Sequence, residues 1–477
     1  MNNHFEVNMS GNTNEQESRG VLTQGTAQVP DLSRPRGAGA SSGGTTTASS
    51  TVGPDNAGPE IPGLAVAPVV PLRRNWSFQA IWIGQTTSTL GVSVADLAYP
   101  LAILMVTGSA GWAGFFAAIQ SLGALLAGLP AGSLADRYNP RTIVVAGEIG
   151  RALVTAAVAV GLIGGWLSLP LLLLAAAFLG IGSSVTGAAR LLLVRSVVPN
   201  SQLTQALTLD EVRQNGAALA GPAIGGALYG LRALAHAAPF LFTAFSFVVA
   251  LISAAVMRLL PGGASEPESD AKAALAPPAG GGMLAGVRTL WQQRTLRAAL
   301  VLIMLVNTVG SGLDLMIIVI LRHQEIPSGT IGLVLASGAI GGLAGAPLVK
   351  VLHRLPPGVL LIAVVAAWVP LYSLIAVPFG PWWVAVLIFV MTLGIPALRV
   401  MIDILVIRRA APSERGRVVG ALMTLIAVGI PAGLAGAGLL LEWLPAQSAL
   451  LLLAALLAVA ALYGATSRDL RKAEWPG

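Results

Sequence analysis

The chain has 477 residues, of which 55% are hydrophobic and only 10% charged, and its mean hydropathy is +0.77. This composition is typical of a polytopic membrane protein and excludes an ordinary soluble domain. The absence of cysteine excludes disulfides, thiol catalysis, iron–sulfur clusters and cysteine-ligated zinc. The four histidines lack the spacing of a metal site, and no lysine follows a glycine as in a phosphate-binding loop. We therefore expect no metal, no cofactor and no ATP hydrolysis by the chain itself.

Residues 1–75 are predicted to form a disordered cytoplasmic tail. Up to about Leu72 the tail is rich in Gly, Ser, Thr, Asn and Pro and has no apolar period. It lacks the apolar core of a secretory signal, and Glu6, Glu15 and Glu17 argue against a transit peptide. The favoured interpretation is that the tail is a leader segment that binds no partner, and the alternative is that it is a binding module.

Roughly twelve apolar segments follow, each long enough to cross about 30 Å of hydrocarbon as a helix. Their approximate cores are Ala80–Val106, Trp112–Leu134, Thr142–Gly164, Leu169–Val194, Leu203–Leu231, Pro239–Leu259, Leu296–Leu321, Ile331–Leu352, Val359–Pro378, Trp382–Ile407, Val418–Leu441 and Ala449–Ala465. Because the number is even, both termini are expected on one side of the membrane.

The basic residues between these segments mark that side. They cluster in the loops on the side of the termini, from Arg73 to Lys472, whereas the opposite loops offer only Arg232 and Arg322. The positive-inside rule therefore places both termini in the cytoplasm, and the formal charge of +7 indicates a membrane side and no nucleic-acid partner. The predicted regions after the tail are an N-terminal six-helix bundle at 76–260, a cytoplasmic linker at 261–293, a C-terminal six-helix bundle at 294–466 and a cytoplasmic tail at 467–477.

The two halves look like copies of one another. Segment 89–91 precedes Asp96 in the first predicted helix as segment 308–310 precedes Asp314 in the seventh, and Gly221-Pro222 in the fifth corresponds to Ile430-Pro431 in the eleventh. The offset of about 210–220 residues is that expected for two six-helix halves related by an axis along the membrane normal.

A short charged turn separates the second and third predicted helices, and Asn139-Pro140 within it breaks any helix. The turn reads Gly-Ser-Leu-Ala-Asp-Arg-Tyr-Asn-Pro-Arg and resembles the signature loop of the major facilitator superfamily, Gly-x-Leu-Ala-Asp-Arg-x-Gly-Arg-Arg/Lys. The matching positions are Gly132, Leu134, Ala135, Asp136, Arg137 and Arg141. The sequence departs from the signature at Asn139 and Pro140.

The resemblance implies a role for this turn. An aspartate at the end of the second helix can meet the positive N-terminus of another helix, and the family places the eleventh helix, beginning near Gly416-Arg417, beside it. We interpret Asp136, Arg137 and Arg141 as a conformational latch that favours the outward-open state, with a simple helix-stop loop as the alternative. The second half has Lys350 where the first has Asp136, so the latch is one-sided.

The fifth predicted helix carries a glycine-rich motif. Its members are Gly216, Gly221, Pro222, Gly225 and Gly226. Glycines one turn apart let helices approach closely and the proline kinks the helix, so ordinary packing is one interpretation. The arrangement also resembles the Gly-Pro-x-x-Gly-Gly motif associated with drug/proton antiporters of the superfamily. Together with the charged turn, it resembles the bacterial drug-efflux and siderophore-export branch, which includes macrolide-efflux and enterobactin-exporter-like proteins.

Two acids in predicted helices are candidates for proton coupling or cation binding. An ionisable group at bilayer depth costs roughly 2.5–3.5 kcal/mol, so it needs a partner, water or a proton. Asp96 and Asp314 have no basic residue within a helical turn or two on their own helices, and they hold matching positions in the two halves. Related exporters often carry an acid where this chain has Val92, and Asp96 lies one turn later on roughly the same face, so it is expected to replace that acid.

Two other acids have basic neighbours. Glu148 precedes Arg151 by three residues, which favours a structural ion pair. Asp403 follows Arg399 by four residues, and the alignment of the halves places it opposite Arg190. Because helices 1, 4, 7 and 10 line the cavity in this superfamily, the resemblance implies a charged cavity floor there. Structural locking and substrate contact remain open for these three residues.

The sequence therefore predicts an all-α membrane protein with twelve transmembrane helices in two pseudo-symmetric bundles. By resemblance it is a monomeric, non-enzymatic secondary transporter in the cytoplasmic membrane of a bacterium. It would export a small amphipathic compound, such as a drug, natural product or siderophore, through the lipid bilayer in exchange for protons. The alternatives are a transporter of lysophospholipid or another lipid, and a membrane sensor that does not transport.

Overall fold

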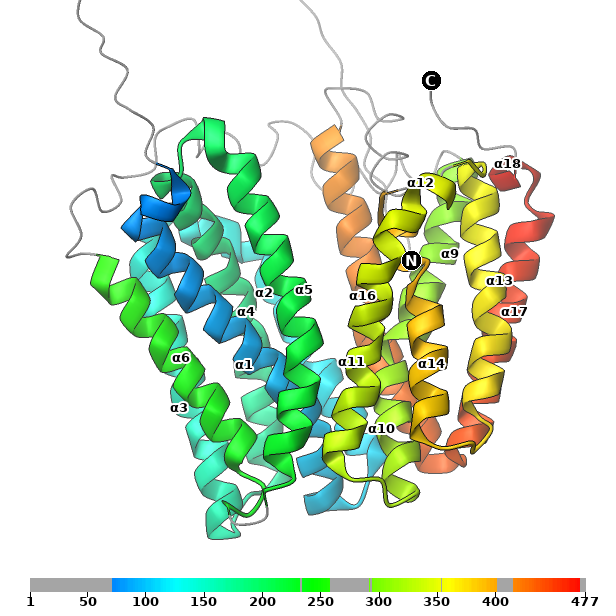
Figure 1. Ribbon diagram of the computed structural model, residues 1–477, viewed down its shortest axis with the longest axis horizontal. Coiled ribbons are helices and arrows are strands. Elements are labelled where there is room, and N and C mark those ends of the chain that lie inside the picture. The colour runs from blue at the N-terminus through cyan, green and yellow to red at the C-terminus, as the bar shows by residue number, and fades with distance from the viewer. Residues whose placement is uncertain are drawn as a thin grey trace, which may run out of the picture. The chain divides into compact units, whose positions relative to one another are not determined.

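The computed structural model describes residues 71–231, 234–257, 291, 294–352, 354–400 and 415–471. All described residues belong to one unit, Pro68–Gly477. Every regular element in these residues is a helix, as the apolar segments predict (Figure 1).

The first bundle is formed by six long helices. Their bounds are α1 Trp76–Thr107, α2 Ala110–Arg137, α3 Pro140–Gly164, α4 Leu169–Val197, α5 Leu203–Tyr229 and α6 Ala238–Val256. Short 3-10 turns, η1 at Leu72–Arg74 and η2 at Asn200–Gln202, precede α1 and α5.

The second bundle has the same order of helices with more interruptions. Its elements are α9 Arg294–Ser311, α10 Leu313–His323, α11 Ser328–Gly345, η5 Ala346–Leu348, α12 Val349–Leu352, α13 Pro357–Ile375, α14 Pro381–Thr392, α16 Arg415–Trp443, α17 Ala446–Thr466 and α18 Arg468–Arg471. The seventh predicted helix is thus divided into α9 and α10 at Gly312. A further helical stretch, 395–400, follows α14 after a turn.

Eleven helices within the described ranges are long and apolar enough to cross a membrane. The twelfth predicted span corresponds to α5, which is 27 residues long but carries Asp210, Glu211 and Arg213 in its first half. Its length still suffices for a crossing, and it packs along α1 and α11.

Local sequence explains the turns between the helices. The Asn139 side chain accepts a hydrogen bond from the Arg141 N–H and caps α3, while Pro140 occupies the first turn, where its missing N–H costs nothing. Gly108 and Gly165 end α1 and α3 with a φ of +69°, a conformation that glycine adopts without strain. The predicted helix break at Asn139-Pro140 is confirmed.

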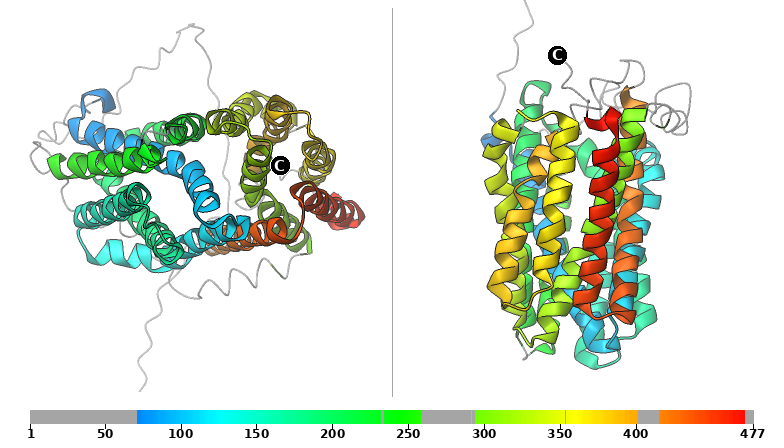
Figure 2. Two further views of the ribbon diagram at one scale, coloured as in Figure 1. Left: turned by 90° about the horizontal axis from the view of Figure 1, so that it is seen from below. Right: turned by 90° about the vertical axis from the view of Figure 1, so that its right-hand side faces the viewer.

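Two helix pairs make most of the contacts between the bundles: α2 lies against α16, and α5 lies against α11 (Figure 2). We call the end at which α1 begins and α17 finishes the near end, and the opposite end the far end. The contacts of both pairs concentrate toward the far end, because they involve the start of α2 and α11 and the last turns of α5 and α16.

Candidate transport site

Asp96 and Asp314 face open space from otherwise buried stretches. Asp96 is exposed, whereas its neighbours Ala95 and Leu97 are 4% and 2% exposed. Asp314 is also exposed, and it is followed on α10 by an unbroken run of buried apolar residues up to Leu321. The two carboxylates belong to different bundles, yet each lies within electrostatic range of the other.

A second group of charges lies inside the first bundle. Glu148 is completely buried, and its Oε1 lies 3.2 Å from Arg151 Nη1. The same oxygen also forms an ion pair with Arg190 of α4, whose Nη2 donates to Ser88 Oγ at 3.1 Å. The Arg151 guanidinium stacks over Phe247, 4.1 Å from the ring centroid. The ion pair expected between Glu148 and Arg151 is present, and Arg190 extends it into a triad.

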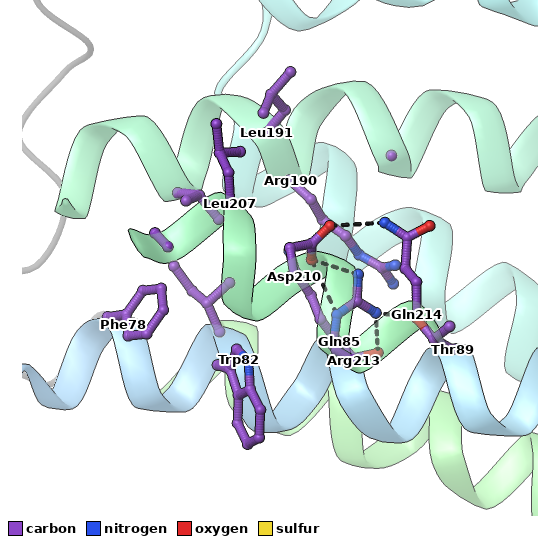
Figure 3. A pocket seen from close by; sticks show the side chains of 14 residues that line it. Phe78, Trp82, Gln85, Thr89, Arg190, Leu191, Leu207, Asp210, Arg213 and Gln214 are labelled. Carbon is purple, nitrogen blue, oxygen red and sulfur yellow. Dashed lines mark hydrogen bonds and ion pairs between the residues drawn. The ribbon is translucent and has the colours of Figure 1, made fainter. Parts of the chain in front are cut away.

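A cavity of about 300 Å³ opens beside this triad, in the near-end part of the first bundle (Figure 3). It is lined by α1, α4 and α5, and both Arg190 and Arg213 point into it. Its apolar wall is made by Phe78, Ile81, Trp82, Leu191, Val194 and Leu207. The cavity therefore combines guanidinium groups with a hydrophobic surface, as ligand pockets commonly do.

The polar wall of the cavity is a hydrogen-bonded network on α5 and α1. Arg213 Nε donates to Asp210 Oδ1 at 3.0 Å, and Gln214 Nε2 donates to Asp210 Oδ2 at 2.9 Å. Arg213 Nη1 reaches across to the backbone carbonyl of Gln85 at 3.0 Å and to the hydroxyl of Thr89. The network holds Arg213 in place, because its guanidinium is bonded on both sides.

The predicted charged floor is only partly visible. Arg399 Nη1 lies 3.1 Å from Glu211 Oε1 of α5, and both side chains are largely exposed. Arg190 and Arg399 therefore bind different carboxylates, and the structure does not bring them to a common one. Asp403 lies outside the described residues.

Comparison with known families accounts for this architecture. The model of the family described as Major Facilitator Superfamily matches residues 81–433. The chain belongs to this superfamily. No curated protein sequence matches the chain.

Solved structures share the superfamily fold at low sequence identity. A mutant form of the nucleoside transporter NupG has a TM-score of 0.65 and 11% identity, with 82% of this chain and 99% of that chain covered. An inward-facing, unoccupied bacterial homologue of the human lysosomal transporter Spinster gives 0.64 and 17%, covering 85% and 99%. An inward-facing bacterial homologue of the iron transporter ferroportin gives 0.63 and 17%, covering 84% and 100%. These likenesses show the fold of a membrane transporter, without indicating the substrate.

The glycine motif of α5 lies at two helix contacts, one with α1 and one with α11. A Cβ at Gly225 would lie 2.6 Å from the Val94 carbonyl oxygen of α1, and one at Gly221 would meet Ser93. A Cβ at Gly226 would lie 2.9 Å from the Ser328 carbonyl carbon of α11, so this glycine permits the contact between bundles. Pro222 and Gly216 complete the motif. The Pro222 backbone packs against Gly332 of α11, whereas a Cβ at Gly216 would meet nothing within 4 Å.

The superfamily signature turn lies at the near end. Asp136 and Arg137 are exposed in the last turn of α2, and Gly132 has space for a Cβ. Among the described side chains, Asp136 makes no ion pair, and the side chains at the start of α16 are outside that set. Arg141 follows the Asn139 cap at the start of α3. The latch proposed for Asp136, Arg137 and Arg141 stays a prediction.

Sequence reasoning missed several charged residues. Asp210, Glu211 and Arg213 lie inside the predicted span Leu203–Leu231, and charges inside a span are themselves a signal of function. Glu442 was missed at the far end, where its Oε2 accepts hydrogen bonds from Ser109 Oγ at 2.6 Å and the Gly111 N–H at 3.1 Å. No local sequence pattern links residues 331 positions apart.

Proposed function

We propose that the chain is a secondary active transporter that exports a small amphipathic compound across the cytoplasmic membrane in exchange for protons. The observation that carries the proposal is the pair of exposed carboxylates, Asp96 and Asp314, at matching positions of the two bundles. An acid that is open to one side of the membrane in one state and to the opposite side in the other takes up a proton on one side and releases it on the other.

The contacts between the bundles support alternating access. Both helix pairs meet toward the far end, where Gly114 of α2 contacts Gly438 of α16 and Gly226 of α5 contacts Ser328 of α11. With both termini in the cytoplasm, this geometry corresponds to a state open to the cytoplasm. Rocking the bundles apart at the far end and together at the near end would expose the same acids to the other side.

Proton release tests this function. Inverted membrane vesicles that contain the protein are loaded with a pH-sensitive dye, energised, and treated with candidate compounds one class at a time. We expect at least one compound to dissipate the proton gradient with the parent chain and to fail with Asp96→Asn or Asp314→Asn. The matched control is Glu325→Gln, which neutralises an exposed acid between α10 and α11.

The outcomes separate the alternatives. Release that survives both substitutions would retain transport and move the proton site elsewhere, with Asp403 as the next candidate. Failure of every compound in correctly inserted protein would contradict proton-coupled export. Lipid transport or a sensor function would then be the better interpretations.

A further inference from the structure

The cavity between α1, α4 and α5 contains more guanidinium groups than carboxylates. Arg190 and Arg213 line it, and Arg151 lies behind Arg190 on the shared Glu148. Asp210 neutralises Arg213, but Glu148 is the only carboxylate within ion-pair distance of both Arg151 and Arg190 among the described residues. One positive charge in this region therefore lacks a carboxylate of its own.

Among the described residues, no more distant acid forms an ion pair that would neutralise this charge. Asp96 acts on Arg151 electrostatically from farther away but makes no ion pair with it among the described residues. Glu211 is engaged with Arg399 on the other bundle. A buried guanidinium is stabilised most strongly by an anion that it can contact directly.

Of the two guanidinium groups that share Glu148, that of Arg190 is the one that a ligand can reach. Its side chain is 16% exposed, whereas that of Arg151 is 4% exposed and covered by Phe247. Arg213 repels Arg190 across the cavity more strongly than Asp210 attracts it, so a negative group placed between the two arginines would interact favourably with both. Arg213 presents its guanidinium from the opposite wall, held by Asp210 and the Gln85 carbonyl (Figure 3).

We infer that this cavity binds the anionic headgroup of an amphipathic molecule, a phosphate or carboxylate, between Arg190 and Arg213, with the apolar tail along the wall that contains Phe78 and Leu207. The inference deepens the proposed export function and rests on it for the role of the site in transport. The volume of about 300 Å³ is at the lower limit of ordinary ligand pockets. It therefore suits a single headgroup with a short chain.

Binding to the full chain in phosphatidylcholine nanodiscs tests the inference. The probes are decyl phosphate, decanoate, decyltrimethylammonium and decyl maltoside, which share a ten-carbon tail and differ in headgroup charge. Calorimetric titration with empty nanodiscs subtracts simple membrane partitioning. We expect the two anions to bind about tenfold or more tightly than the cation and the neutral probe. Equal or tighter binding of decyltrimethylammonium would overturn the inference.

Two substitutions are expected to act in opposite directions. Arg190→Gln should weaken decyl phosphate binding about tenfold or more, and it should fold because Glu148 keeps Arg151 as its partner. Glu148→Gln removes the competing internal carboxylate, so the folded fraction should bind decyl phosphate more tightly. Arg190→Lys should retain part of the affinity. The matched control is Arg322→Gln, an exposed arginine at the far-end tip of α10. Unchanged binding in Arg190→Gln would refute the site.

Two further experiments identify the source of the anion and separate this inference from the proposed function. If phosphatidylglycerol in the nanodisc weakens decyl phosphate binding to the parent chain and not to Arg190→Gln, a lipid headgroup occupies the site; otherwise the ligand is a free amphiphile. Decyl phosphate that binds through Arg190 without dissipating the proton gradient would uphold the site and contradict antiport of this probe. Proton release by cationic compounds alone, without anion binding, would uphold antiport and overturn the site.

Discussion

The two bundles differ in what they bury. Among the described residues, the buried polar and charged side chains of the first bundle are Ser77, Gln85, Ser88, Glu148, Arg151, Thr155, Thr186, Thr243 and Ser246, whereas the second bundle contributes only Ser328. The two bundles thus have different interiors. The first bundle holds charge within its core, whereas the described interior of the second bundle is apolar, and Asp314 is the one acid on α9 and α10.

This difference has a physical consequence for ligand recognition. A charged interior is costly unless each group is paired, so it constrains sequence and geometry strongly. An apolar interior tolerates exchange of similar side chains as long as volume is kept. We therefore expect headgroup recognition to depend on the first bundle and the second bundle to contribute mainly packing and Asp314.

The largest expected effect comes from comparing two substitutions that nearly preserve volume, one in each interior. Glu148→Gln removes the one carboxylate that, among the described residues, contacts both buried Arg151 and partly buried Arg190, and it should lower the free energy of unfolding by about 3–5 kcal/mol. Met316→Leu, at a fully buried position of α10, should cost less than about 1.5 kcal/mol. Thermal or denaturant unfolding of the detergent-solubilised protein, followed by tryptophan fluorescence, measures both.

Glu325→Gln is the control for this pair, because it neutralises an exposed acid and should change stability by less than about 0.5 kcal/mol. Equal losses for Glu148→Gln and Met316→Leu would mean that the two interiors are not energetically different. The proposed contrast between the bundles would then fail.

The next effect concerns the helices by which the bundles touch. A Cβ at Gly114 would lie 2.6 Å from Gly438 Cα and 2.6 Å from the Leu434 carbonyl oxygen. Gly114→Ala should therefore disfavour the closed far end by about 1–3 kcal/mol. The control is Gly436→Ala, also on α16, because a Cβ at that position would meet nothing within 4 Å.

Because the chain contains no cysteine, spin labels can be placed without removing native thiols. Spin labels are attached at Trp166→Cys and Phe379→Cys, which lie in exposed far-end loops of the first and second bundle. Double electron–electron resonance then measures the distance between the two labels. The distance distribution should shift to longer values in Gly114→Ala and remain that of the parent in Gly436→Ala. A parental distribution in Gly114→Ala would show that α2 and α16 separate without involving this contact.

Much of this organisation was predictable from the sequence, and the reasons are local. Long apolar runs predict helices, Asn139-Pro140 predicts a break between two of them, and the spacing of Glu148 and Arg151 predicts their ion pair. The matching positions of Asp96 and Asp314 follow from the internal repeat.

The remaining parts of the site depend on distant contacts. Arg190 lies 42 positions after Glu148 and on another helix, so nothing in its local sequence indicates that the two share an ion pair. The alignment of the halves places Asp403 opposite Arg190, and that placement stays a prediction because Asp403 lies outside the described residues. The packing of α3 against α4 and α6 buries Glu148 at a place where, among the described residues, Arg151 and Arg190 reach it.

A smaller effect is expected at the far-end hydrogen bonds between α16 and the start of α2. Glu442→Gln removes the negative charge that accepts from Ser109 Oγ and the Gly111 N–H. Since Glu442 is exposed, the change should disfavour the closed far end by less than about 1 kcal/mol. The same spin-label pair measures the shift, and Glu325→Gln again serves as the control. A shift larger than that of Gly114→Ala would mean that charge, and not helix packing, closes this end.

The smallest effect should come from the one ion pair that joins the bundles among the described residues, Arg399 with Glu211. Its side chains are 70% and 48% exposed, so solvent screens the pair, and its coupling energy should be below about 1 kcal/mol. A double-mutant cycle of Arg399→Gln and Glu211→Gln in the unfolding assay isolates that energy, because changes to either side chain's other surroundings cancel. A coupling well above 1 kcal/mol would show that the near end is held by charge as strongly as the first bundle's interior. The contrast between a charged core and weakly coupled surfaces between the bundles would then have to be abandoned.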